Sequence, residues 1–187
     1  MKPKRQHQVM IAGTGGRGIL MIGRLLAEAG MTRYQHVSYF PNYGAAMRGG
    51  DSEVTVILAD DEISSPAIFN PEVAMVMDLS FFKPMAARVK PEGMLLVDSS
   101  VVSAKVKRKD ITAYYLPVTQ KALDMGNVQV ANIILLGAYL EATGVVPIEV
   151  VEQALEKRML GTRREVLLSV DKQALKEGAK LMASSKG

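Results

Sequence analysis

Four glycines and an arginine are closely spaced near the start of the chain, where they could hold an anionic group. The segment reads Gly13-Thr-Gly15-Gly16-Arg17-Gly18, and it lies between the apolar run 8–12 and the helix-forming stretch 19–29. Glycines allow a tight turn and let backbone N–H groups approach a phosphate, and a helix N-terminus adds partial positive charge. The pattern predicts a strand, a glycine loop and a helix in succession.

Ordinary NAD binding is not favoured by the residues that follow this loop. A dinucleotide site places an acidic residue about 20 residues further on, at the end of the second strand. Residues 34–40 contain no Asp or Glu, and Glu28 lies within the predicted helix. Three alternatives stay open: the glycines permit close strand–helix packing, they contact the backbone of a partner, or they bind the phosphates of another ligand.

A second glycine-rich segment also has residue types suited to anion recognition. It reads Tyr43-Gly44-Ala-Ala-Met47-Arg48-Gly49-Gly50. Consecutive glycines permit unusual backbone angles, and they leave the Arg48 guanidinium free for a bidentate contact with carboxylate or phosphate. The alternative is that Arg48 ties the loop to a carboxylate of its own domain.

The elements that must position these loops are predicted from the apolar runs. Runs that are continuous rather than alternating indicate a parallel sheet covered on both faces. Strands are expected at residues 8–12, 36–40, 54–58, 73–77, 94–97 and 114–118. Pro41 is expected to end the second strand, and residues 42–52 are expected to form a loop.

Helices are expected between these strands and throughout the C-terminal part. They are predicted for residues 19–29, from about residue 80, for residues 132–142, after Pro147, and along a final stretch lined by Leu167, Val170, Ala174 and Leu181. Gly30 and Gly144 are predicted to close helices, and Thr162 with Glu165 resembles a capping box. The sequence predicts one α/β domain over residues 1–187, with a three-layer, Rossmann-like, mostly parallel sheet, a helical C-terminal part and a flexible tail at 1–7.

Composition excludes several kinds of chemistry. The 187 residues include no Cys, so disulfides, thiolate metal sites and Cys-ligated clusters are ruled out, and two His cannot build a His-rich metal site. The net charge of +4 comes partly from basic groups at the N-terminus and at 105–109, which lack the interleaved aromatics of a nucleic-acid surface. No apolar stretch reaches the roughly 18 residues of a membrane span, so a cytoplasmic protein without nucleic-acid or membrane partners is expected.

Several segments together resemble one family. The glycine loop 13–18, the Tyr43–Gly50 loop, the Ile63-Ser64-Ser65-Pro66 turn and the run Val73-Ala-Met-Val-Met-Asp78 are similar, in order and spacing, to the gamma subunit of 2-oxoacid:ferredoxin oxidoreductases. The similarity extends from about residue 8 to 140 and is nearest to the 2-oxoglutarate and 2-oxoisovalerate branch. One departure is Arg17, where the family usually has Gln.

The resemblance implies a division of labour. Alpha and beta subunits, with a delta or ferredoxin-like subunit, would hold thiamine diphosphate, Mg²⁺ and [4Fe-4S] clusters, decarboxylate a 2-oxoacid, reduce ferredoxin and form an acyl-coenzyme A. This chain would bind none of these cofactors, carry no catalytic residue, be inactive alone and serve subunit assembly. The absence of Cys and of a Gly-Asp-Gly motif agrees with that implication.

Both loops are expected at the carboxyl ends of the strands, where α/β folds bind ligands. There Gly13, Gly15, Gly16, Arg17 and Gly18, with Arg48, Gly49 and Gly50, would contact either coenzyme A phosphates or a partner subunit. The competing hypothesis is a stand-alone nucleotide-binding module. Self-association as a homodimer is expected for a subunit stripped of its partners.

Overall fold

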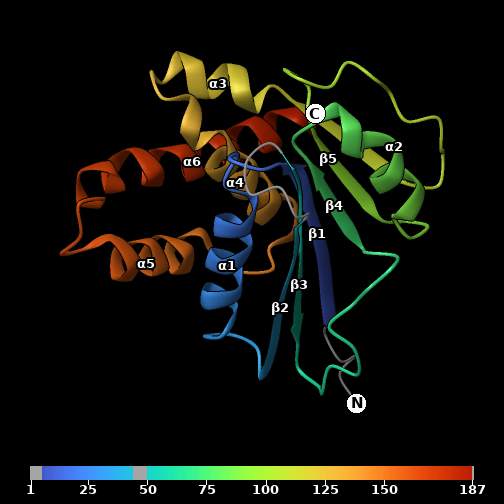
Figure 1. The fold of residues 1–187 in the computed structure, drawn as a ribbon, viewed down its shortest axis with the longest axis horizontal. Coiled ribbons are helices and arrows are strands. Elements are labelled where there is room, and N and C mark those ends of the chain that lie inside the picture. The colour runs from blue at the N-terminus through green and yellow to red at the C-terminus, as the bar shows by residue number, and fades with distance from the viewer. Residues whose placement is uncertain (1–5, 44–49, 187) are drawn as a thin grey trace.

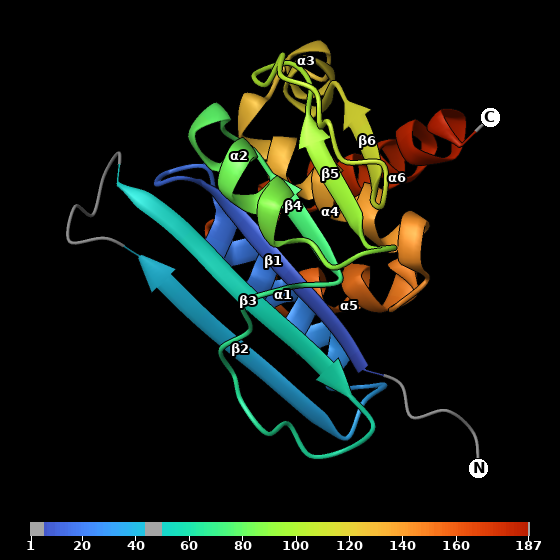
Figure 2. The same ribbon diagram turned by 90° about the vertical axis from the view of Figure 1, so that its right-hand side faces the viewer.

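The computed structural model describes residues 6–43 and 50–186, so the predictions for Arg48, Gly49 and most of the N-terminal tail lie outside the described residues. Six strands form one sheet in the order β2-β3-β1-β4-β5-β6 (Figures 1 and 2). The strands are β1 (Gln6–Thr14), β2 (His36–Tyr43), β3 (Asp51–Ala59), β4 (Val73–Val76), β5 (Met94–Asp98) and β6 (Thr112–Leu116).

The helices alternate with the strands at first and then follow one another. They are α1 (Ile19–Gly30), α2 (Leu79–Arg88), α3 (Val118–Asp124), α4 (Ala131–Thr143), α5 (Ile148–Met159) and α6 (Leu168–Ser185), with short 3-10 turns η1 (Val128–Val130) and η2 (Glu165–Leu167). Figure 1 shows α1, α4, α5 and α6 on one side of the sheet and α2 on the other. The predicted α/β class, with helices on both faces and a helical C-terminal part, is confirmed.

The sheet is mostly parallel, as predicted. Strand β1 pairs in parallel with β4, β4 with β5, and β5 with β6. Strand β3 pairs antiparallel with both of its neighbours, β1 and β2, so β2 runs in the same direction as β1. The carboxyl ends of β1 and β2 therefore lie at the same edge of the sheet.

The expected end of the second strand at Pro41 is wrong. Strand β2 continues through Pro41 to Tyr43, which pairs with Ser52. A proline is tolerated there because β2 is the edge strand, where a missing N–H need not break a ladder hydrogen bond. The expected loop at 42–52 is correspondingly shorter, since β3 begins at Asp51.

Helices α4 and α6 meet with almost no side chain between them. A Cβ atom added to Gly137 would lie 2.0 Å from the carbonyl oxygen of Leu175, and one added to Gly178 would lie 1.9 Å from that of Ile134. Every residue of α4 from Ala131 to Leu140 is buried, and most of these side chains are apolar. Close backbone contact with α6 is one of the ways in which α4 is removed from water.

The buried stripe of α6 differs from the predicted one. It consists of Ala174, Leu175, Gly178 and Met182. Of the four predicted residues, Ala174 is buried and Val170 and Leu181 are partly buried against the core, whereas Leu167 belongs to η2 and is exposed. The buried face of α6 is centred near Gly178, because the helix approaches α4 most closely where this residue has no side chain.

Two predicted helix ends are corrected and one is confirmed. Gly144 closes α4 in the left-handed conformation, with φ of 61°. Gly30 is the last residue of α1 and Met31 is the C-cap, so the predicted cap is displaced by one residue; a Cβ atom on Gly30 would come within 2.4 Å of Leu58 Cδ2, so Gly30 permits close packing. At the predicted capping box, the Glu165 carboxylate accepts a hydrogen bond from the Gly161 N–H, and Thr162 Oγ1 accepts one from the Arg164 N–H. These bonds form a turn, whereas in a capping box Thr162 and Glu165 would each accept from the backbone N–H of the other.

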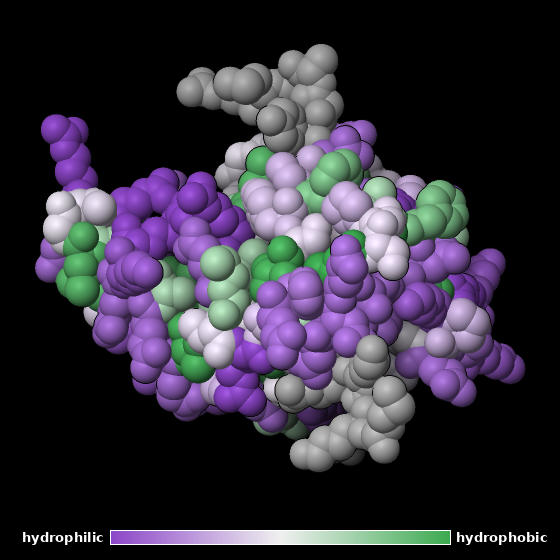
Figure 3. All heavy atoms as spheres, turned by 90° about the horizontal axis from the view of Figure 1, so that it is seen from below, coloured by the Kyte–Doolittle hydropathy of each residue, from purple (hydrophilic) through white to green (hydrophobic). Residues whose placement is uncertain are grey.

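No helix among residues 6–43 and 50–186 has the length and hydropathy needed to cross a membrane. The same residues include no group of three or more metal-ligating side chains. Seen from below, the surface is mainly hydrophilic, with hydrophobic side chains in small separate groups (Figure 3).

Candidate functional site

The glycine loop lies at the carboxyl end of β1 and contacts the end of the second predicted loop. The Gly15 N–H donates a hydrogen bond to the Gly50 carbonyl oxygen, with 2.8 Å between N and O. Gly16 and Gly18 have φ of 98° and 70°, a region that favours glycine. The structure thus brings together Gly15 and Gly50, while Arg48 and Gly49 lie outside the described residues.

The glycines do not all serve one purpose. A Cβ atom at Gly13 would lie 3.0 Å from Ile19 Cδ1, and one at Gly18 would lie 2.2 Å from Asn132 Nδ2. A Cβ atom at Gly16 would meet nothing within 4 Å. Gly13 and Gly18 are therefore closely packed, against α1 and α4 respectively, whereas Gly16 leaves the backbone accessible.

The N-terminus of α1 lies beside this loop, and no side chain caps it. Gly18 occupies the N-cap position, and the first turn has no acidic residue. The buried side chain of Asn132 donates a hydrogen bond of 3.2 Å to the Gly18 carbonyl oxygen and so fixes the loop to α4. Uncapped N–H groups and the helix dipole make this end of α1 electropositive.

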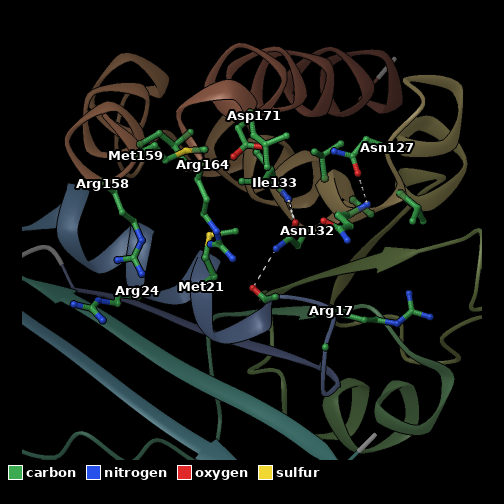
Figure 4. A pocket seen from close by; sticks show the side chains of 18 of the residues that line it. Arg17, Met21, Arg24, Asn127, Asn132, Ile133, Arg158, Met159, Arg164 and Asp171 are labelled. Carbon is green, nitrogen blue, oxygen red and sulfur yellow. Dashed lines mark hydrogen bonds between the residues drawn. The ribbon is translucent and has the colours of Figure 1, made fainter. Parts of the chain in front are cut away.

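A cleft of about 1060 Å³ separates the glycine loop and α1 from the C-terminal helices. Its walls are the loop and first turns of α1, the segment 127–133, the end of α5 and the turn into α6 (Figure 4). Apolar side chains such as Met21, Ile133 and Met159 alternate with charged ones. The lining includes five arginines, Arg17, Arg24, Arg158, Arg163 and Arg164, against one carboxylate, Asp171.

The arginines differ in what they contact. Arg24 and Arg158 both bind the Glu28 carboxylate, at 2.9 Å and 3.0 Å. Arg164 reaches from the α6 side across the cleft toward Met21 (Figure 4). Burial raises the pKa of the Asp171 carboxyl, and the charge of Arg164 opposes that rise. An excess of positive charge therefore remains in the cleft beside apolar side chains.

Arg17, one of the predicted binding residues, borders the cleft but extends away from Arg164 toward α2 (Figure 4). Its positive charge helps to lower the pKa of the Asp78 carboxyl. The structure thus places Arg17 close enough to Asp78, a carboxylate of its own domain, for a local electrostatic role. Such a role is the alternative to a contact between Arg17 and a ligand.

Asp78 fixes the edge of the sheet next to the glycine loop. Its carboxylate accepts from Thr14 Oγ1 at 2.7 Å and from the Ser80 N–H at 3.0 Å, which caps α2. The Thr14 hydrogen bond is the main cause that lowers the pKa of Asp78. A carboxyl whose pKa is lowered by folding stabilises the fold above its unfolded-state pKa, and this contribution is lost as the pH falls through the folded pKa.

We expect Asp78→Ala to lower the free energy of unfolding by about 1 kcal/mol at about pH 7, because a helix cap is lost. The difference from the original chain should shrink as the pH falls below about 4, the pKa of an unfolded-state Asp, and through the lower pKa of Asp78 in the folded chain. Urea unfolding followed by circular dichroism across this range measures it. A difference that is the same at every pH would show that the charge of Asp78 contributes nothing.

Sequence reasoning missed the residues that the C-terminal part contributes to the site. Asn132, Arg163 and Arg164 lie more than a hundred positions after the glycine loop, yet all three line the same cleft. Asn132 carried a usable signal, because it is a polar residue in an otherwise apolar helix. The arginine pair carried none, since adjacent basic residues usually form a solvated surface.

An open, mostly parallel α/β sheet with a glycine loop at the carboxyl end of its first strand defines a domain of the doubly wound class. Within that class, the chain belongs to the family described as pyruvate ferredoxin/flavodoxin oxidoreductase, whose model matches residues 8–181. The resemblance found in the sequence is confirmed.

Relatives of this chain contain the domain either as nearly their whole length or as part of a longer chain. The 2-oxoglutarate synthase subunit KorC of Methanocaldococcus jannaschii is 30% identical over 173 residues, which cover 90% of this chain and 92% of KorC. The ketoisovalerate oxidoreductase subunit VorA of Methanothermobacter marburgensis is 31% identical over 136 residues, which cover 73% of this chain but only 28% of VorA. The chain therefore corresponds to less than a third of the length of some relatives.

Solved structures have the same fold. The gamma subunit of a keto/oxoacid ferredoxin oxidoreductase from Geobacter sulfurreducens superimposes with a TM-score of 0.80 and 26% identity, over 95% of this chain and 99% of that one. A 2-oxoglutarate:ferredoxin oxidoreductase from Magnetococcus marinus, determined with 2-oxoglutarate, coenzyme A and succinyl-CoA bound, gives a TM-score of 0.87 over 97% of this chain and 32% of that one. At 21% identity the second match shows the fold.

Proposed function

We propose that the chain is the gamma subunit of a 2-oxoacid:ferredoxin oxidoreductase that oxidatively decarboxylates a 2-oxoacid to an acyl-coenzyme A. The observation that carries the proposal is the family match over residues 8–181, together with the near-complete overlap with KorC. The names of the relatives favour 2-oxoglutarate or a branched-chain oxoacid as the substrate.

The residues of this chain do not fit the redox cofactors of such an enzyme. Iron–sulfur clusters need cysteine thiolates, and the chain contains no Cys. Thiamine diphosphate, Mg²⁺ and [4Fe-4S] clusters are therefore assigned to the alpha, beta and delta or ferredoxin-like subunits. The contribution of this chain is assembly of the complex, and a cytoplasmic location and a homodimer of the isolated chain are parts of the same proposal.

Coenzyme A fits the chemistry of the cleft. It carries a diphosphate and a 3′-phosphate, which the arginines and the uncapped N-terminus of α1 would attract. The apolar lining suits the less polar parts of the molecule. When bound, coenzyme A accepts the acyl group, and the role of this chain is to hold its phosphates with Arg163, Arg164 and the accessible backbone at Gly16.

Contact with a partner subunit is the alternative role for the same edge of the sheet, and it is favoured for Arg48, Gly49 and Gly50. Gly15 donates its N–H to the Gly50 carbonyl oxygen, so the glycine loop contacts the last residue of the second segment. The stand-alone nucleotide-binding module is the weaker hypothesis, because Glu28, the first acidic residue after the loop in the sequence, is held by Arg24 and Arg158.

The test is an anaerobic affinity purification of the tagged chain from its own cells, with the co-purifying proteins identified by mass spectrometry. We expect a brown eluate that contains thiamine- and cluster-bearing subunits and reduces ferredoxin with a 2-oxoacid and coenzyme A. A colourless chain without these partners, which retains a nucleotide, would contradict the proposal and support the stand-alone module.

A further inference from the structure

Negative charge is concentrated in one part of the chain. Residues 51–72 contain six acidic residues and no basic one, although the chain as a whole carries a net charge of +4. They form β3 and the connection from β3 to β4, residues 60–72, which we call the strap. The acidic residues are Asp51, Glu53, Asp60, Asp61, Glu62 and Glu72.

The strap lies beside a sheet face that no helix covers. In Figure 2, β2 and β3 face the viewer without a helix in front of them, whereas α2 lies over β4 and β5. The register pairs Phe40 with Thr55 and Asn42 with Glu53, so these four side chains share one face. Thr55 in turn pairs with Met10, which packs in the core cluster under α2. The face of β2 and β3 that no helix covers therefore continues the face that α2 covers, and its β3 residues Thr55 and Ile57 are buried.

Arg88 holds the strap in place against this face. Its Nε donates to the Phe69 carbonyl oxygen at 2.9 Å, and its NH2 donates to the Ile68 carbonyl oxygen at 3.3 Å. Its NH1 binds the Glu53 carboxylate at 3.2 Å, and the guanidinium lies 5.1 Å from the centroid of the Phe69 ring. Four contacts from one side chain give the strap a fixed position before any partner arrives.

Two aromatic side chains remain exposed on this prearranged surface. Phe69 is 75% exposed on the strap and Phe40 is 42% exposed on β2. Aromatic side chains dominate the energetics of protein interfaces, and a rigid surface loses little entropy on binding. Their position next to fixed negative charge indicates the kind of partner that fits.

We propose that β2, β3 and the strap form a docking surface for a positively charged, partly apolar surface of another subunit of the oxidoreductase. The inference rests on the proposed function. Phe40 and Phe69 would enter apolar pockets of that subunit, and the exposed carboxylates of Asp51 and Glu62 would pair with its Lys and Arg side chains. The arginine-lined cleft beside α1 stays separate from this contact, because it opens toward the C-terminal helices.

The test measures how tightly the purified full chain binds the remaining subunits, which are purified together from cells that lack this chain. We expect Phe69→Ala and Phe40→Ser each to weaken binding about 10-fold or more. Glu62→Lys should slow association about threefold and reduce its dependence on salt concentration. Leu123→Ala, at a residue that is 54% exposed on α3, and Glu141→Lys on α4 are the matched controls and should bind as the original chain does.

The outcomes separate the two proposals. If the original chain does not bind the other subunits, the proposed function is wrong and the docking surface falls with it. If the original chain binds and the Phe69, Phe40 and Glu62 variants bind equally well while their circular dichroism is unchanged, the docking surface alone is overturned. If the Phe variants lose only self-association of the chain, the occupant is a second copy and the proposal is also overturned.

Discussion

Gly178→Ala will destabilise the protein by about 3 kcal/mol or more, although alanine is the better helix former. Helix propensity alone would favour the substitution by about 1 kcal/mol. The added Cβ atom, however, would lie 1.9 Å from the Ile134 carbonyl oxygen, and this neighbour is backbone, which cannot move without displacing α4. Gly137→Ala should behave in the same way, because its Cβ atom would lie 2.0 Å from the Leu175 carbonyl oxygen.

Thermal and urea unfolding of both glycine variants measure the effect, with Gln173→Ala as the matched control. Gln173 lies in α6, is exposed, and should change stability by less than about 0.5 kcal/mol. A stabilised Gly178→Ala variant would show that α4 and α6 do not approach as closely as their backbones are placed.

Arg163→Ala and Arg164→Ala will each raise the KM for coenzyme A of the assembled enzyme about tenfold or more. Each change removes a charge-assisted hydrogen bond to phosphate, which is worth roughly 1.5–3 kcal/mol. The turnover number should change little, because the phosphates lie away from the reacting thiol and bind equally in the ground and transition states. The prediction rests on coenzyme A occupying the cleft.

Lys157→Ala is the control for these arginines, since Lys157 is exposed on α5 and does not line the cleft. Steady-state kinetics with varied coenzyme A, and calorimetric titration of the complex with coenzyme A, measure the two quantities independently. An unchanged KM and affinity in the Arg164→Ala enzyme, with its subunits still assembled, would show that coenzyme A binds elsewhere.

The class of the fold was predictable from the sequence because buried parallel strands give continuous apolar runs. The run at 73–77 and the glycine-bounded run at 8–12 correspond to the adjacent strands β4 and β1. The opposite direction of β3 was not predictable, because a two-residue period carries no information on strand direction. Nor was the extent of β2, since the effect of Pro41 depends on whether its strand lies at an edge.

The candidate site was predictable only in its local part. The glycine loop is contiguous in sequence, and its position at the end of β1 follows from the strand–loop–helix order. The other wall of the cleft is assembled by tertiary contacts: Asn132 reaches the Gly18 carbonyl oxygen because α4 is buried beside α1, and Arg164 follows from how α5 turns into α6. Such contacts between distant segments leave no spacing pattern in one sequence.

The glycine contact between α4 and α6 also bears on how the chain is synthesised. Helix α4 is mostly apolar and buried, and residues 168–185, which pack against it, follow all the other core elements in the chain. A nascent chain that has reached Thr143 would therefore expose an apolar helix for as long as the ribosome needs to add the next 42 residues. Chaperones that bind exposed apolar segments would have their main opportunity in that interval, and docking of α6 would end it.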